Sequence, residues 1–246
     1  MFNVDLIARR IAQHWQSDVA LPKPVADLIA VWEESQYALA PATPATADCT
    51  VKNVSERIEK LALALAVADK HGEASRRIRD AVAVKLVEAA DDALPGIIEQ
   101  QLQPQALKAA ARYAEAVTQL PERFTADDLL VAAPEISAAY NTAVDAARTL
   151  KGCENFIRST SDLPVHGGDP ATPLLIVAAA TRDDLQAIYD AKAGSPAETK
   201  LAPVYRVAVA RGLTFRLATV AESDALRAEI DAQPVERKHP QFLRLS

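Results

Sequence analysis

One long segment, residues 53–94, carries apolar side chains at helical spacing almost without interruption. Steps of four and three residues place one set on a single stripe of a helix, and the pattern resumes after His71 and Gly72. The first set is Val54, Ile58, Leu61, Leu65 and Ala68, and the second is Ile78, Val82, Leu86, Ala89 and Ala93. The spacing predicts two long helices, or one broken helix, whose stripes must be buried against another surface.

Glycine, proline and capping residues divide the chain around this segment into further helices. Gly72 is expected at the C′ position that ends the first long helix, and Pro95 and Gly96 are expected to end the second. Pro104 begins a third helix, and Thr125 with Asp128 three residues later predicts the start of another. A last helix begins at or kinks at Pro134 and is closed by Gly152. Residues 53–152 are therefore predicted to form a helical bundle.

The residues before this bundle predict a helical hairpin, residues 1–40, followed by a linker. The first helix covers residues 2–16 and carries Trp15 on its apolar side; Pro24 suits the first turn of a second helix, which carries Trp32. The Pro-, Ala- and Thr-rich segment at 41–52 cannot continue a helix and has little to bury, so we interpret it as a linker.

The pattern changes after Gly152, and residues 153–232 predict a small β-α-β-β-α unit. The apolar run at 174–180 is short enough for a buried strand, and Thr181 with Asp184 begins a helix. Residues 204–220 predict a β-hairpin, because a three-residue loop gives one coherent apolar face and puts Gly212 in the left-handed conformation. A helix at about 221–232 and an extended tail, residues 233–246, complete the prediction.

Composition favours a mainly α, Ala-rich fold. Half of the residues are hydrophobic but only 5% are aromatic, so small aliphatic side chains, alanine above all, carry the apolar fraction. Alanine is the best helix former because it loses no side-chain entropy. A net charge of −6 argues against sequence-specific nucleic-acid binding. No window approaches the ~20 apolar residues that span a bilayer, and the N-terminus lacks a signal peptide, so we expect a cytoplasmic protein.

The motifs that mark cofactor or metal sites are missing from the sequence. Seven glycines leave neither the dinucleotide-binding nor the phosphate-binding glycine pattern, and the two cysteines lie too far apart for a zinc pair. His71, Gly72 and Glu73 have the first half of a zinc-deaminase motif but lack its cysteine partner. We expect no catalytic residues, no cofactor and no metal.

The best candidate for a ligand loop is His166 to Asp169. Backbone N–H groups beside its two glycines can line an anion site, with a His and an Asp on either side, and Arg206 is a third residue to test there. The same four residues are also ordinary turn chemistry. This interpretation predicts an enzyme or small-molecule-binding site where the bundle meets the α/β unit.

The candidates for a protein interface are two tryptophans and a basic patch. Trp15 and Trp32 are typical helix–helix anchors, and they become interface hot spots if they are partly exposed. Arg76, Arg77 and Arg79 form a basic patch that Glu73 and Asp80 can neutralise as a solvated face, or that an anionic partner can bind.

These observations favour a non-catalytic structural protein that assembles with itself or with other protein subunits. A bacteriophage virion component, from the head or neck, suits a chain of this composition without motifs, and it would place the protein in the virion. The alternatives are the ligand-binding site described above and a regulatory adaptor that presents the N-terminal hairpin to one partner protein.

Overall fold

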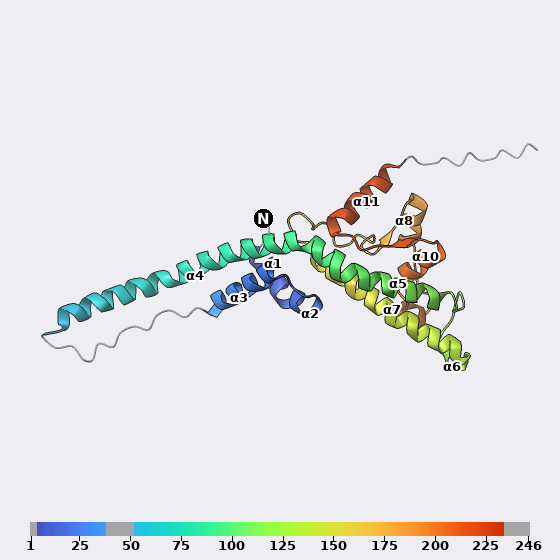
Figure 1. The fold of residues 1–246 in the computed structure, drawn as a ribbon, viewed down its shortest axis with the longest axis horizontal. Coiled ribbons are helices and arrows are strands. Elements are labelled where there is room, and N and C mark those ends of the chain that lie inside the picture. The colour runs from blue at the N-terminus through green and yellow to red at the C-terminus, as the bar shows by residue number, and fades with distance from the viewer. Residues whose placement is uncertain (1–3, 38–51, 234–246) are drawn as a thin grey trace, which may run out of the picture. The chain divides into compact units, whose positions relative to one another are not determined.

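The structure is a computed structural model that describes residues 4–37 and 52–233 (Figure 1). The predicted linker up to residue 51 and the predicted tail from residue 234 lie outside these residues, as does Phe2. The described chain is mainly helical, which confirms the predicted class and the helical bundle. None of the described helices combines the length and hydropathy needed to cross a bilayer.

The chain divides into two compact units. Unit 1 consists of Met1–Ile97 together with Asp162–Val165, and unit 2 consists of Ile98–Ser161 and His166–Ser246. The division therefore falls inside the segment 53–152, at the end of the long helix. Each unit has its own buried core.

Unit 1 packs two short helical segments against one long helix. Its elements are α1 (Val4–Arg10), a π-helical turn η1 (Ile11–Trp15), α2 (Gln16–Asp18), α3 (Lys23–Tyr37) and α4 (Val54–Ile97). Both α1 and α3 contact α4 (Figure 1). Ile11, Trp15, Ile29 and Trp32 from the short segments and Leu86 and Leu94 from α4 form the buried core.

The helix α4 is one uninterrupted helix, so the prediction of a break at Gly72 was wrong. Gly72 keeps a helical backbone, and a Cβ placed there would meet nothing within 4 Å. A glycine inside a helix costs only ~1 kcal/mol relative to alanine, which neighbouring Ala, Leu, Glu and Arg residues offset. The predicted end at Pro95 and Gly96 was also wrong, because α4 runs to Ile97 and a π-helical turn, η2 (Ile98–Leu102), follows directly.

Unit 2 is built on two long helices, α5 (Gln103–Val117) and α7 (Pro134–Ser159), which pack side by side. The short helix α6 (Ala126–Val131) begins with the predicted capping pair: Thr125 and Asp128 each accept a hydrogen bond from the other's backbone N–H. The helix α7 begins at Pro134, as one prediction had it, but it continues past Gly152. The predicted end at Gly152 was therefore wrong, again because a helical glycine is tolerated.

The remaining elements of unit 2 pack against these helices. In chain order they are β1 (Val177–Ala178), α8 (Arg182–Tyr189), α9 (Pro196–Thr199), α10 (Pro203–Ala210), β2 (Thr214–Phe215) and α11 (Val220–Ala232). The strands pair antiparallel, with Val177 opposite Phe215 and Ala178 opposite Thr214. The predicted cap of α8 by Thr181 and Asp184 is present, and α11 lies where the last helix was predicted.

The predicted β-hairpin at 204–220 was wrong, because its first strand is the helix α10. Pro203 starts the helix, and Tyr205 and Ala208, three residues apart, supply its buried side. Gly212 does adopt the predicted left-handed conformation, with φ +66°, but as the residue that ends α10. The N–H of Gly212 donates a hydrogen bond to the carbonyl of Val209, and the N–H of Leu213 donates one to the carbonyl of Ala208. These two hydrogen bonds form a Schellman motif.

Candidate functional site

Two features of the described residues have the character of sites: an exposed apolar stripe on α4 in unit 1 and a pocket beside α7 in unit 2. The described residues contain no cluster of three or more His, Cys, Asp or Glu that could hold a metal ion. Most of the residues selected from the sequence have structural roles.

The two tryptophans lie in the core of unit 1. Trp15 is 1% exposed and Trp32 is 5% exposed, so both rings pack within the chain. This is the placement that helix–helix anchors require, and it leaves almost no surface for a partner. An interface built from these rings stays a prediction, and the accessible surface of unit 1 lies elsewhere.

The basic patch of α4 is partly neutralised within unit 1. Arg77 donates to Glu73 at 2.5 Å, one helical turn before it, and Arg79 lies 3.8 Å from a carboxylate oxygen of Asp5 in α1. Such exposed pairs contribute little to stability. Arg76 is exposed. Two of the three arginines thus have acidic partners inside the chain, as expected for a solvated face.

The loop from His166 to Asp169 is fixed against the start of α11. The N–H of Ala221 bonds the carbonyl of His166, and the N–H of Asp169 donates to Asp224 at 2.7 Å. A Cβ at Gly168 would displace the Asp224 carboxylate from its present position and crowd Val220, so glycine suits this close approach. Gly168 therefore lets the loop turn closely against α11, which agrees with the structural interpretation of this loop.

Arg206 holds together a different part of unit 2. Its guanidinium lies 3.5 Å from Glu198, donates to the carbonyl of Pro121 at 2.5 Å and sits 5.5 Å from the centre of the Phe124 ring. Burial of Glu198 acts to raise its pKa, but backbone N–H bonds from Gly194 and Phe124 outweigh this, so the pKa is lowered. Arg206 and Asp169 thus belong to separate networks.

The α4 stripe, defined as Val54, Ile58, Leu61, Leu65 and Ala68, is the first of the two sites. These residues continue the register of the buried face of α4, but the first buried residue of the helix is Ala83. Ile58 is 61% exposed and Leu65 is 54% exposed. The uncharged run LALALAVA, residues 61–68, surrounds the helix at this point. Figure 1 shows α1 and α3 along the later part of α4 only.

This exposed half of α4 keeps its helical form through local interactions. Lys60 donates to Glu56 at 2.5 Å and Arg77 to Glu73 at 2.5 Å, both one turn apart with the acid first, which is the favourable order. The side chain of Lys60 lowers the pKa of Glu56 through this bond. Ala and Leu between these pairs have the highest helix propensities. The first half of α4 is thus a helix that presents uncovered apolar surface.

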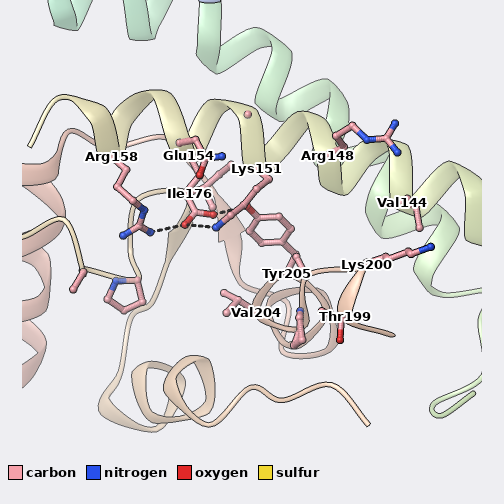
Figure 2. A pocket seen from close by; sticks show the side chains of 16 residues that line it. Val144, Arg148, Lys151, Glu154, Arg158, Ile176, Thr199, Lys200, Val204 and Tyr205 are labelled. Atoms are coloured by element: carbon pink, nitrogen blue, oxygen red, sulfur yellow. Dashed lines mark hydrogen bonds and ion pairs between the residues drawn. The ribbon is translucent and has the colours of Figure 1, made fainter. Parts of the chain in front are cut away.

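The second site is a cavity of about 930 Å³ beside α7, named here the α7 pocket (Figure 2). Part of its lining is apolar: Val144, Ala171, Pro173, Ile176 and Val204. The other part is charged: Arg148, Lys151, Glu154, Arg158 and Lys200. Because α7 continues past Gly152, Lys151, Glu154 and Arg158 fall on one face at spacings of three and four.

Glu154 is the centre of the charged part of the pocket. Its carboxylate accepts from Arg158 at 2.6 Å, from Lys151 at 3.1 Å and from the hydroxyl of Tyr205 in α10 at 2.6 Å (Figure 2). Burial acts to raise the pKa of Glu154, but these hydrogen bonds and the Lys151 charge outweigh it, so the pKa is lowered. Burial and the Glu154 charge raise the pKa of Tyr205, which stays a neutral donor. The site holds one fixed carboxylate among several cations.

The sequence analysis missed this pocket, and one signal pointed to it. Lys151, Glu154 and Arg158 have the spacing of one helix face, but that pattern is visible only if the helix passes Gly152. The sequence predicts a strand at Tyr205, and that prediction gives no reason to expect a contact with Glu154, 51 residues away in the sequence. Comparison of the chain with models of protein families, with curated proteins and with solved structures found no match.

Proposed function

We propose that this protein is a non-catalytic assembly protein whose copies associate through the α4 stripe. The observation that supports this most is the exposure of Val54, Ile58 and Leu65 on the same face of α4 that is buried from Ala83 onward. Contiguous exposed apolar surface of this kind marks interaction sites in soluble proteins. None of the described helices covers this surface, which favours a partner chain as its cover.

The spacing of the stripe favours another helix as the partner. Steps of four and three residues from Val54 to Ala68 are the repeat of a coiled coil, in which one helix inserts its side chains between those of its neighbour. The repeat is interrupted after Ala68, where Gly72, Ser75 and Arg79 occupy the same positions. The contact is therefore limited to about two heptads at the start of α4.

A second copy of this chain is the partner we propose. The whole chain carries a net charge of −6, which makes copies repel one another, but acidic and basic side chains nearly balance over residues 54–80. Two copies can thus approach here without that repulsion, and closed homodimers are the commonest soluble oligomers. The stripe has only a few large side chains, each worth about 1.5–3 kcal/mol when fully buried. We therefore expect association that is reversible and depends on concentration.

Light scattering over a concentration series tests this proposal. The wild-type mass should rise above the monomer mass of 26.4 kDa, and Leu65→Glu should return it to the monomer. Leu63→Glu is the matched control, because Leu63 is also exposed but lies on the opposite side of the same helix. A wild-type monomer at every concentration, or an equal effect of the two variants, would contradict a contact through the stripe.

The size of the assembly decides between the broader roles. A defined small oligomer is what a two-heptad contact predicts, and a large closed particle would favour the bacteriophage head or neck component expected from the composition. A monomer that binds one different protein through the stripe would instead make the chain a regulatory adaptor. In either of these cases the same residues of α4 are the ones to vary.

A further inference from the structure

The α7 pocket combines an apolar wall with an excess of positive charge. In a chain whose net charge is −6, this lining carries four basic side chains, Arg148, Lys151, Arg158 and Lys200, against one carboxylate, Glu154. Arg148 is paired with Asp145 at 2.9 Å, outside the lining. Glu154 offsets one of the three remaining cations. The pocket therefore keeps a positive charge that a bound anion can neutralise.

The cations around Glu154 have hydrogen-bonding capacity to spare. A lysine ammonium has three N–H donors and an arginine guanidinium has five, and Lys151 and Arg158 each use one on Glu154. Glu154 holds both side chains in position through these hydrogen bonds without using up their donors. Lys200 is exposed and takes part in none of the ion pairs found among the described residues of the pocket and its surroundings. Its ammonium is the flexible cation of the pocket.

The backbone of the pocket also departs from ordinary geometry. Ala202 has φ +51°, the one positive φ at a non-glycine residue in the described chain, and it lines the pocket between Lys200 and Pro203. L-residues adopt this conformation only when the surroundings impose it, and such strain concentrates at binding sites. Here it joins the end of α9, next to Lys200, to the start of α10, which carries Tyr205.

We propose that the α7 pocket binds a small molecule in which an oxyanion, a carboxylate or a phosphate, is attached to an apolar body. The oxyanion binds the free donors of Lys151 and Arg158. Lys200, on the other side of Tyr205 in Figure 2, adds its positive charge to the potential of the pocket. The apolar body lies against Val144, Ile176 and Val204. Pockets of this size, mostly apolar with a few converging polar groups, are typical of small-molecule sites. The site is separate from the α4 stripe, so it does not depend on association.

Calorimetric titration of the full chain with four probes tests each part of this ligand. Octyl phosphate and octanoate carry both an oxyanion and an apolar chain, inorganic phosphate carries only the anion, and 1-octanol carries only the chain. One of the first two should bind about tenfold or more tightly than either partial probe. The better of the two identifies the oxyanion as phosphate or carboxylate. Equal binding of 1-octanol, or no binding of either complete probe at about 1 mM, would overturn the proposal.

Matched variants locate the binding in the α7 pocket. Lys200→Glu reverses an exposed charge without a partner to lose, so the fold should be preserved while affinity falls about tenfold. Lys108→Glu is the control, because Lys108 is an exposed lysine of α5 outside the pocket, and affinity should stay within about twofold. Lys151→Gln should weaken binding as well. Unchanged affinity in both Lys200→Glu and Lys151→Gln, or an equal loss in Lys108→Glu, would refute the site.

Discussion

The two halves of α4 have the same apolar spacing and opposite surroundings. In the second half, Leu86 is 0% exposed and packs in the core of unit 1, whereas in the first half Leu65 is 54% exposed. Both belong to one continuous register of the helix. An amphipathic pattern thus predicts that a face of the helix will be covered, but it does not show whether the same chain or another one covers it.

The largest expected effect is in the covered half. Leu86→Ala should lower the free energy of unfolding by about 2–5 kcal/mol, because it leaves a cavity between α4 and the packed helices of unit 1. Urea denaturation followed by circular dichroism measures this loss. A loss below about 1 kcal/mol would show that this half of α4 is not part of a packed core.

A smaller effect is expected at Asp91, the buried acid of the covered half. Its carboxylate accepts from the N–H of Val165 at 2.7 Å and so ties the segment Asp162–Val165 to unit 1. Asp91→Ala leaves that N–H without its acceptor and should cost about 1–3 kcal/mol of unfolding free energy. The neighbouring exposed Asp92, changed to alanine, should alter it by less than about 0.5 kcal/mol. Equal effects of Asp91→Ala and Asp92→Ala would show that the hydrogen bond from Val165 to Asp91 does not stabilise unit 1.

Alanine substitutions at the two helical glycines distinguish the local stability of the first half of α4 from the global stability of the protein. Gly72 and Gly152 are both open to an added Cβ, so alanine at either should stabilise its helix by about 1 kcal/mol. Gly152→Ala should raise the free energy of global unfolding, because α7 is packed in unit 2. Gly72→Ala should instead slow amide exchange near residue 72 about fivefold and leave global unfolding unchanged. A global gain from Gly72→Ala would mean that the first half of α4 is covered within the chain.

The smallest effect on stability is expected at Leu65 itself. At a concentration where the protein is monomeric, Leu65→Ala should change the free energy of unfolding by less than about 0.5 kcal/mol, because little packing is lost. The same variant should weaken association, so its denaturation midpoint should lose any dependence on protein concentration. A loss of 2 kcal/mol or more in the monomer, on the order of a core truncation, would make Leu65 a core residue.

The sequence predicted the helical class and several helix starts because these depend on local chemistry. The pairs Thr125–Asp128 and Thr181–Asp184 satisfy backbone N–H groups within one turn, and Pro134 starts α7 for an equally local reason. The continuation of α4 past Gly72 and of α7 past Gly152 could not be predicted in the same way. A glycine ends a helix only if the chain turns there, as it does at Gly212, and that depends on what packs nearby.

The hairpin and the pocket required knowledge of distant contacts. Alternating Tyr205, Val207 and Val209 fit a strand, but packing buries Tyr205 and Ala208 and overrides the β propensity of valine. Glu154 meets Tyr205 only because α7 and α10 come together in the folded unit. The stripe on α4 was visible in the sequence, while its exposure in the first half was not.

Self-association through α4 is tested most directly by amide hydrogen exchange of residues 54–80 at a low and a high protein concentration. If a second copy covers the α4 stripe, exchange of residues 54–68 should slow as concentration rises, while exchange of residues 83–97 stays the same. Leu65→Glu should remove this dependence. Exchange of residues 54–68 that is identical at both concentrations, in a sample whose mass also stays at the monomer value, would contradict self-association through this helix.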